Sequence, residues 1–433
     1  MGACHMNDSR TRHSATMRWT SRLAATALAA LLQACVTPPV DAPRPAVVSA
    51  PVEARAPVTI LISIDGFKPD YLTRGVTPNL NALAAAGISA AMRPSFPSVT
   101  FPNHWTVVTG LRPDRHGIVG NRMEDAAHPG MTFTMQSEEP FWWTEADPIW
   151  ITAERAGIRT ATMFWPGANI SFGGLRPSDW QQYGHEVSNR QRVDAIIDWL
   201  RRPAATRPQF LTLYFDVVDS AGHANGPDSP KTTAVVADVD AAIGRLQREL
   251  AALGQTANFV ITADHGMAAT SPERVIRFDQ ITSPASFRFI TGGTYAGIEP
   301  MPGHEAALAA VIAKPHPHMQ CWPKAQIPAA LRYGKHPRVP SVICLAETGW
   351  LILDKAPPPD RPLRAGGAHG YDPAAPEMAA LFIASGPAIR AAGGLESFDN
   401  VDVAPLLRSI LGLPANERLD GNDRPFRAAL NKQ

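Results

Sequence analysis

The stretch VTILISIDGF, residues 58–67, decides the fold class. Its first part, Val58–Ile64, is a nearly continuous apolar run that is rich in β-branched residues. Such a run is typical of a strand that is buried on both faces, as in a parallel sheet covered by helices. Asp65 follows directly, at the carboxyl end of the predicted strand, where open parallel sheets carry their ligand crevice.

Similar apolar runs recur along the chain and alternate with helical patterns. The runs are FLTLYF (210–215), NFVIT (258–262) and MAALFIA (378–384), and the helical patterns cover 77–86, 191–200 and 232–253. This alternation predicts an α/β fold: a doubly wound, mostly parallel sheet with helices on both faces. We expect one catalytic domain over 58–433, with a smaller α+β insertion or cap at about 268–350, where Pro and aromatic residues are denser.

The composition indicates a globular protein. The chain has 433 residues, of which 45% are hydrophobic and 18% charged, and its formal net charge is +1. No dense Lys/Arg stripe is present, so nothing supports nucleic-acid binding through the phosphate backbone.

The N-terminal part predicts export. Residues 17–35, MRWTSRLAATALAALLQAC, combine a basic start, a short apolar run and small residues before Cys35, as in a secretory signal that starts at Met17. The ending LQAC resembles a bacterial lipobox, which implies lipidation of Cys35; an ordinary signal peptide with an incidental cysteine is the alternative. Residues 36–57 are rich in Pro and Ala and predict a tether. We therefore expect a periplasmic or outer-membrane-tethered lipoprotein, held at the membrane by its lipid anchor.

Two further cysteines, Cys321 and Cys344, would lie in an oxidising compartment if the protein is exported. A disulfide between them is expected, and two buried free thiols are the alternative.

Six potential metal ligands follow predicted strands or lie in glycine-flanked loops. They are Asp65, Asp219, His223, Asp264, His265 and His369. Three carboxylates and three imidazoles can hold two divalent ions, and mixed O/N ligation without thiolate suits zinc, with manganese or iron also compatible. Each residue alone has a structural explanation, such as a turn at Asp65 or a salt bridge between Asp219 and His223. Their joint position on one expected rim favours the metal site.

Thr100 stands in PSFPSVTFPNH, residues 94–104. Taken alone, its hydroxyl would be a turn cap beside proline. The wider chain changes this interpretation, because seven motifs occur in a fixed order: IDGF (64–67), SVTFPNH (98–104), TGLRPDRHGIVGN (109–121), WPG (165–167), DSAGH (219–223), ADHGM (263–267) and GAHGYD (367–372).

From about Val58 to Leu413, the chain resembles the nucleotide pyrophosphatase/phosphodiesterase family of the alkaline phosphatase superfamily, in particular its single-domain bacterial members. The resemblance implies two zinc ions and a covalent threonine intermediate. It implies that Thr100 is the nucleophile and binds one zinc with Asp65, Asp264 and His265. Asp219, His223 and His369 would bind the other zinc, and Asn121 would hold a phosphoryl oxygen. Val99 and Val218 depart from residues common in animal members, and neither is at a ligand position.

The expected substrate is a small phosphodiester. Four aromatic residues could form walls on which a nucleobase stacks: Phe101, Trp165, Tyr183 and Tyr214. Trp165 and Tyr214 could instead be core aromatics, and a choline group could use similar side chains through cation–π contacts. We expect hydrolysis of nucleotide phosphodiesters or pyrophosphates to nucleoside 5′-monophosphates. The alternatives are a choline- or lipid-head-group phosphodiesterase, a phosphomonoesterase of the same superfamily, and a non-catalytic lipoprotein that binds phosphoryl ligands.

Overall fold

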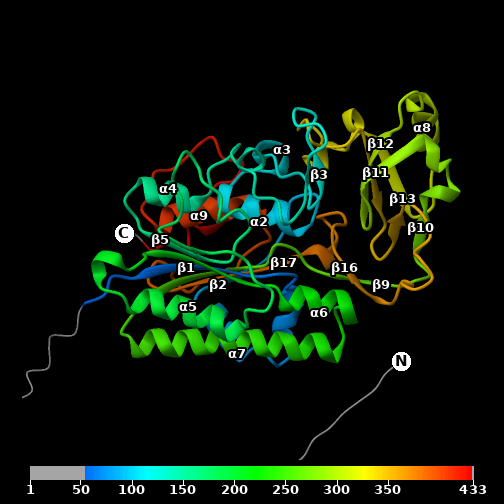
Figure 1. Ribbon diagram of the computed structural model, residues 1–433. Coiled ribbons are helices and arrows are strands. Elements are labelled where there is room, and N and C mark those ends of the chain that lie inside the picture. Colours follow the sequence, from blue (N-terminus) through cyan, green and yellow to red (C-terminus); the bar gives the residue numbers. More distant parts are fainter. Residues whose placement is uncertain (1–53, 432–433) are drawn as a thin grey trace, which may run out of the picture. The chain divides into compact units, whose positions relative to one another are not determined.

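The computed structural model describes residues 54–431, and an eight-stranded sheet is its central feature (Figure 1). In spatial order the strands are β18 (Gly393–Gly394), β2 (Ile88–Met92), β17 (Ala380–Ser385), β8 (Ala257–Thr262), β1 (Val58–Ile64), β7 (Phe210–Phe215), β5 (Thr160–Met163) and β6 (Asp179–Gln181). Neighbouring strands are parallel except that β17 is antiparallel to both β2 and β8. The predicted fold class is confirmed.

Helices cover both faces of this sheet (Figure 1). On one face lie α1 (Pro78–Ala86), α5 (Asn189–Arg201), α6 (Val217–Asn225) and α7 (Pro230–Ala252), and on the other lie α2 (Thr100–Thr109), α4 (Ile149–Arg155) and α9 (Val403–Ile410). The short helix α3 (Pro113–His116) follows α2. Local signals fix several helix starts: α5 begins at a capping box between Ser188 and Gln191, and α7 begins with Pro230 after the cap Ser229.

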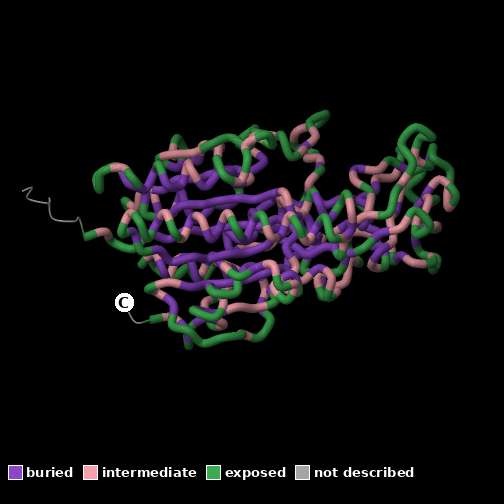
Figure 2. The backbone as a smooth tube through the Cα atoms, turned by 90° about the horizontal axis from the view of Figure 1, so that it is seen from below, coloured by how far each residue is buried: buried purple, intermediate pink, exposed green. Residues whose placement is uncertain are grey.

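The apolar run Val58–Ile64 forms β1 at the centre of the sheet. All its residues are buried, and the central strands form the most continuously buried part of the backbone (Figure 2). In the register of β1, Ile64 pairs with Phe215 of β7, and Ser63 pairs with Thr262 of β8. These three strands therefore end at nearly the same level, which brings the residues after them to one edge of the sheet.

Residues 271–365, here called the small subdomain, lie between β9 (Ala268–Thr270) and β16 (Gly366–Ala368), which pair with each other in a two-stranded sheet of their own. The small subdomain holds α8 (Glu305–Ile312), the pair β10 (Val275–Arg277) and β15 (Leu351–Leu353), and an antiparallel sheet of β11 (Phe287–Thr291), β12 (Tyr295–Pro300), β14 (Val342–Ala346) and β13 (Met319–Pro323). The predicted insertion, 268–350, stops before β16, because Gly366–Ala368 carries no apolar pattern. Cys321 and Cys344 face each other across β13 and β14 and form a disulfide.

The predicted signal segment, Cys35 and nearly all of the predicted tether lie outside the described residues. Within residues 54–431, no helix has the length and apolar content needed to cross a bilayer. Residues 54–431 belong to one compact unit.

Candidate active site

Three aspartates meet at the carboxyl ends of the central strands. Asp65 directly follows β1, Asp264 comes shortly after β8, and Asp219 lies in α6, which follows β7. Gly66 permits this approach, because its φ is +69° and a Cβ there would lie 3.0 Å from the Cα of Asp219. Each aspartate has one buried oxygen without a hydrogen-bond donor: Asp65 Oδ1, Asp219 Oδ1 and Asp264 Oδ2. Burial, together with the carboxylates of Asp264 and Asp219, raises the pKa of Asp65 well above its usual range. A cation bound between these carboxylates would stabilise their ionised form.

Three histidines complete the cluster, and all three are oriented in the same way. Each Nδ1 lies at hydrogen-bond distance from a backbone carbonyl oxygen: His223 from Gly367 at 2.8 Å, His265 from Gly266 at 2.9 Å, and His369 from Ser98 at 3.0 Å. With the proton on Nδ1, the Nε2 lone pair is left for a metal, as is typical of ligating histidines. Burial and the neighbouring imidazoles of His265 and His223 lower the pKa of His369 well below its usual range. His369 is therefore neutral, as a ligand must be.

The Nε2 atoms face the unpaired carboxylate oxygens. Asp219 Oδ1 lies 3.4 Å from His223 Nε2 and 3.5 Å from His369 Nε2. His265 Nε2 lies 3.0 Å from Asp264 Oδ2 and 3.4 Å from Asp65 Oδ1. Ligands about 2.0–2.1 Å from a tetrahedral ion are about 3.3 Å apart, so these separations fit shared coordination. The donor set thus fits two divalent ions. One would lie near Asp219, His223 and His369, and the other near Asp65, Asp264 and His265, whose ligand atoms are close together.

His104 also lies beside this cluster, but both of its ring nitrogens have partners. Its Nδ1 lies 2.9 Å from the carbonyl oxygen of Thr100, and its Nε2 lies 2.8 Å from Ser63 Oγ. Although His104 Nδ1 is also 3.3 Å from Asp264 Oδ2, no free lone pair is left for an ion. His104 therefore connects the backbone of Thr100 to Ser63 in β1 and is not itself a metal ligand.

Thr100 is the first residue of α2, and its hydroxyl faces the metal cluster. Thr100 Oγ1 lies 3.3 Å from His265 Nε2. The N-terminus of a helix favours negative charge, which suits an oxygen that becomes anionic and a phosphoryl group beside it. Asn121 is fixed next to Thr100, because its Oδ1 accepts the backbone N–H of Phe101 at 2.9 Å. This leaves the amide –NH₂ of Asn121 for another partner.

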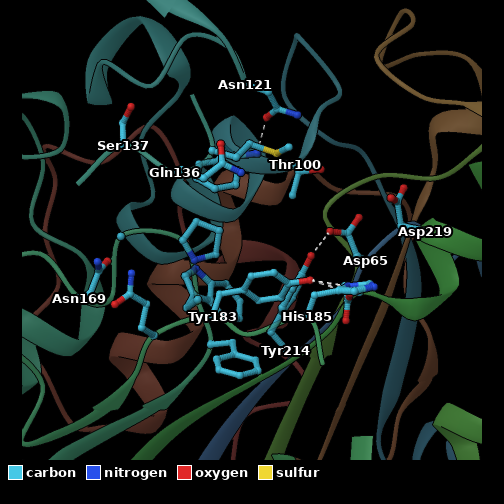
Figure 3. Close-up of a pocket in the computed structure, with 18 of the residues that line it drawn as sticks. Asp65, Thr100, Asn121, Gln136, Ser137, Asn169, Tyr183, His185, Tyr214 and Asp219 are labelled. Atoms are coloured by element: carbon cyan, nitrogen blue, oxygen red, sulfur yellow. Dashed lines mark hydrogen bonds and ion pairs between the residues drawn. The ribbon is translucent and has the colours of Figure 1, made fainter. Parts of the chain in front are cut away.

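A cavity of about 490 Å³ adjoins these groups (Figure 3). In this view Thr100, Asn121, Asp65 and Asp219 lie at one end, and Ser137 and Asn169 lie at the other. All four predicted aromatic residues line the cavity. Their environments differ, since Tyr183 is 49% exposed and Phe101 half-buried, whereas Trp165 and Tyr214 are buried.

The polar atoms of the two buried aromatics are already bonded. Tyr214 donates its hydroxyl hydrogen to Asp65 Oδ2 at 2.6 Å, and Trp165 Nε1–H donates to the carbonyl oxygen of His104 at 3.2 Å. These two side chains therefore brace the cluster, while Phe101 and Tyr183 keep surface that a ligand can contact.

Comparison with known proteins identifies the family. The family model described as type I phosphodiesterase / nucleotide pyrophosphatase matches residues 59–372. The chain belongs to this family. The predicted family is thereby confirmed, and with it the reaction class, phosphodiester and nucleotide pyrophosphate hydrolysis at a two-metal site.

Relatives from several organisms match most of the chain. A bis(5′-adenosyl)-triphosphatase of Xenopus laevis is 36% identical over 84% of this chain and 79% of its own length. Human ectonucleotide pyrophosphatase/phosphodiesterase family member 5 is 34% identical over 82% of this chain and 74% of its own length. Among solved structures, an inactive form of murine family member 5 in complex with AMP has a TM-score of 0.82 and 32% identity, covering 87% of this chain and 100% of that chain.

The structure adds pocket residues of this family member that the sequence analysis did not single out. They are Trp143, Asn169, His185 and Asp216. His104, which contacts the backbone of Thr100 but is not among the lining residues, was not singled out either. Asn169 follows the WPG motif closely, and His104 ends the SVTFPNH motif, so both could have been found by extending the motifs. Asp216 and His185 carry no such signal: Asp216 accepts from Tyr183 at 2.8 Å, lies 3.1 Å from His185 Nδ1 and pairs with Arg192 at 2.6 Å.

Proposed function

We propose that this chain is a zinc-dependent phosphodiesterase that hydrolyses nucleotide diesters or pyrophosphates to nucleoside 5′-monophosphates, with Thr100 as the nucleophile. The observation that carries the proposal is the position of the Thr100 hydroxyl, 3.3 Å from His265 Nε2 and beside a cluster in which three aspartates each keep an unpaired carboxylate oxygen. The murine relative that is inactive carries a threonine-to-alanine substitution, which supports a threonine nucleophile here.

The residues of the chain have distinct roles in this proposal. Asp65, Asp264 and His265 hold one ion beside Thr100, and Asp219, His223 and His369 hold the other. Two bound ions supply Lewis acidity, which favours the threonine alkoxide and offsets the charge that builds on the phosphoryl and leaving oxygens. The bond from Thr100 Oγ1 to phosphorus forms as the bond from phosphorus to the leaving oxygen breaks. Water then splits the phosphothreonine diester, which releases the monophosphate and restores the hydroxyl. The Asn121 amide donates to a non-bridging oxygen throughout.

The nucleotide is proposed as substrate because Phe101 and Tyr183 offer accessible rings at the cavity. Base–aromatic stacking contributes about 1–3 kcal/mol per base. The complex of the murine relative with AMP supports a nucleotide as the ligand of this chain.

A choline-bearing diester is the second candidate. Among the described residues that line the cavity, none is lysine or arginine, while Glu138 and Asp216 are acidic. Such a lining suits a neutral or cationic organic group. It offers no positive side chain for the extra charge of a phosphomonoester, which makes the monoesterase alternative less favoured.

The proposal is tested by measuring hydrolysis of p-nitrophenyl thymidine 5′-monophosphate, p-nitrophenyl phosphate and p-nitrophenyl phosphocholine. Each substrate is assayed with zinc-loaded and with chelator-treated protein. Zinc-dependent preference for the thymidine diester is expected. Thr100→Ala should abolish turnover without loss of bound zinc, and the matched variant Thr100→Ser, which keeps a hydroxyl, should retain part of it. Full turnover in Thr100→Ala would remove Thr100 as the nucleophile. Preference for phosphate would overturn the diesterase assignment, and preference for phosphocholine would select the second candidate.

We also propose that the protein is exported and lipidated at Cys35. The disulfide between Cys321 and Cys344 supports an oxidising compartment. Mass spectrometry of the mature N-terminus should find a lipidated Cys35, and Cys35→Ser should release the protein from the membrane fraction. An unmodified N-terminus at another residue would contradict lipidation.

A further inference from the structure

One side of the cavity is formed by residues 125–145, here called the wall segment. Met135, Gln136, Ser137, Glu138 and Trp143 of this segment line the cavity. The wall segment has little regular structure, namely the short strand β4 (Thr132–Phe133) and a 3₁₀ turn at Pro140–Trp142. Its backbone ladder is short, because β4 pairs only with the two-residue strand β3 (Met123–Glu124), so the shape of the rest of the segment depends on other contacts.

Arg338 supplies most of these contacts from the small subdomain. It lies in the connection between β13 and β14, and it is only 6% exposed. Its guanidinium donates to the carbonyl oxygens of Gly117 (2.9 Å), Phe141 (3.0 Å) and Trp142 (3.0 Å), and it pairs with the carboxylates of Asp125 (2.8 Å) and Glu145 (2.9 Å). It also lies over the Trp142 ring, 5.1 Å from the centroid. The planar guanidinium thus uses its donors on two carboxylates and three carbonyls, which a lysine cannot do.

The chain around Arg338 is shaped to receive it. Gly117 has φ +79°, and a Cβ there would lie 2.7 Å from Arg338 Nη1. Any side chain at this position would therefore push the guanidinium out. His336, two residues before Arg338, places Nε2 2.8 Å from the second carboxylate oxygen of Glu145. Both oxygens of Glu145 are thereby held by the small subdomain.

A short series of contacts connects Arg338 to the nucleophile. Trp143 follows Trp142 directly, and its Nε1–H donates to the carbonyl oxygen of Ser137 at 3.2 Å. The Trp143 ring also packs 5.9 Å from the ring of Phe101, the residue after Thr100. Loss of the Arg338 contacts would therefore displace both the lining residues near Ser137 and the Phe101 ring, on which we propose that the substrate packs.

We infer that Arg338 is a positioning residue: by fixing the wall segment, the small subdomain sets how tightly the organic group of the substrate is bound. Arg338 touches neither the metal ligands nor Thr100, so the reacting centre itself is independent of it. The inference rests on the proposed function, because it takes the substrate to be a diester whose organic group occupies the cavity.

The test compares Arg338→Ala with Arg288→Ala on two diesters. Arg288 is a matched control: it also lies in the small subdomain and pairs with a carboxylate of the main part of the chain, Glu124 of β3 (Met123–Glu124), at 2.6 and 2.8 Å. Unlike Arg338, it is half exposed at the surface, and Glu124 precedes the wall segment. The substrates are the p-nitrophenyl ester of thymidine 5′-monophosphate, which has a base, and methyl p-nitrophenyl phosphate, which has none.

Arg338→Ala should raise KM for the thymidine ester by about tenfold or more, while kcat/KM for the methyl ester changes by less than about twofold. Hydrogen exchange of peptides from residues 125–145 should become faster in this variant. Arg288→Ala should change neither the kinetic constants nor the hydrogen exchange of this segment. The inference would be overturned if Arg338→Ala lowered kcat/KM equally for both diesters, or if hydrogen exchange in the wall segment stayed unchanged.

If Arg338→Ala does not fold, Arg338→Lys decides the question. Lysine keeps the positive charge but cannot make all the contacts of arginine. We therefore expect a smaller rise in KM for the thymidine ester, again with kcat/KM for the methyl ester nearly unchanged. A Lys variant identical to the parent in KM and exchange would contradict the inference. Failure of the parent to hydrolyse either diester would instead contradict the proposed function.

Discussion

Asn121 accepts the backbone N–H of Phe101 through its side-chain oxygen at 2.9 Å, next to the hydroxyl of Thr100. This bond fixes the orientation of the amide, because the oxygen is used and the –NH₂ group remains as a donor. Asn121 lines the cavity. Its position explains how a residue from a loop after α3 can serve a nucleophile at the start of α2.

Removal of this amide should slow the chemical step. In Asn121→Ala the phosphoryl oxygen loses a preoriented donor, and loss of one such donor in other enzymes lowers kcat by about 10²–10³-fold. Steady-state kinetics on the p-nitrophenyl ester of thymidine 5′-monophosphate measures the effect. Bound metal and the thermal midpoint should stay close to the parent. A kcat equal to the parent's would show that Asn121 only holds the Phe101 backbone.

The ligand assignment predicts a change in metal stoichiometry. His369→Ala and Asp264→Ala each remove a ligand from a different group, so each variant should lose about one bound ion per chain and most of its activity. Elemental analysis of purified protein measures this. His185→Ala is a suitable comparison, because His185 lines the same cavity but its Nδ1 faces Asp216 and not the metal cluster. Unchanged metal content in either ligand variant would mean that the ligand is misplaced.

The metal cluster could be predicted from sequence because its signals are local. The β1 strand is a buried apolar run, and acidic residues that follow the strands of a parallel sheet converge at one edge whatever the details of the loops.

Arg338 could not be predicted in this way. It is 221 residues from Gly117 along the chain, and nothing near position 338 indicates a buried arginine. Its role depends on which carbonyl groups the folded chain leaves without partners, and that is a property of the tertiary structure.

The aromatic residues show a similar limit. The sequence identified Phe101, Trp165, Tyr183 and Tyr214 as potential walls, but it could not distinguish an accessible ring from a buried one. In the structure the Tyr214 hydroxyl is used on Asp65, whereas Tyr183 remains half exposed. Burial of each ring is decided by distant segments that pack on it, so residue type alone does not separate the two cases.

Phe101 and Tyr183 should therefore contribute to nucleotide affinity. We expect Tyr183→Ala to raise KM for the thymidine ester by about 5–150-fold, as loss of a stacking contact of about 1–3 kcal/mol implies, with a smaller effect on methyl p-nitrophenyl phosphate. Tyr183→Phe keeps the ring and serves as the control, although it loses the hydroxyl bond to Asp216. If the alanine variant affects both diesters equally, the ring does not contact the base.

Asp402, which is not among the residues that line the cavity, should make stability depend on pH. Burial raises the pKa of Asp402 to about 6, and the carboxylate of Asp399 adds to the effect. An aspartate in the unfolded chain has a pKa near 3.9. Because the folded pKa is the higher one, the folded state binds the proton more tightly. The stabilisation is therefore complete below about pH 4 and is lost as the pH rises through about 6.

Asp402→Asn should remove this dependence. Asparagine keeps the oxygen that accepts from the backbone N–H of Asn422 at 2.7 Å, but it carries no charge. The variant should gain stability relative to the parent at pH 8 and lose that advantage progressively toward pH 4. Urea unfolding of both proteins across this pH range measures the difference between their free energies of unfolding. The metal ligands titrate in both proteins, so their contribution cancels in this difference. A difference that is the same at pH 4 and pH 8 would show that Asp402 titrates alike in the folded and unfolded chain, and that its burial is compensated by the donors of Asn422.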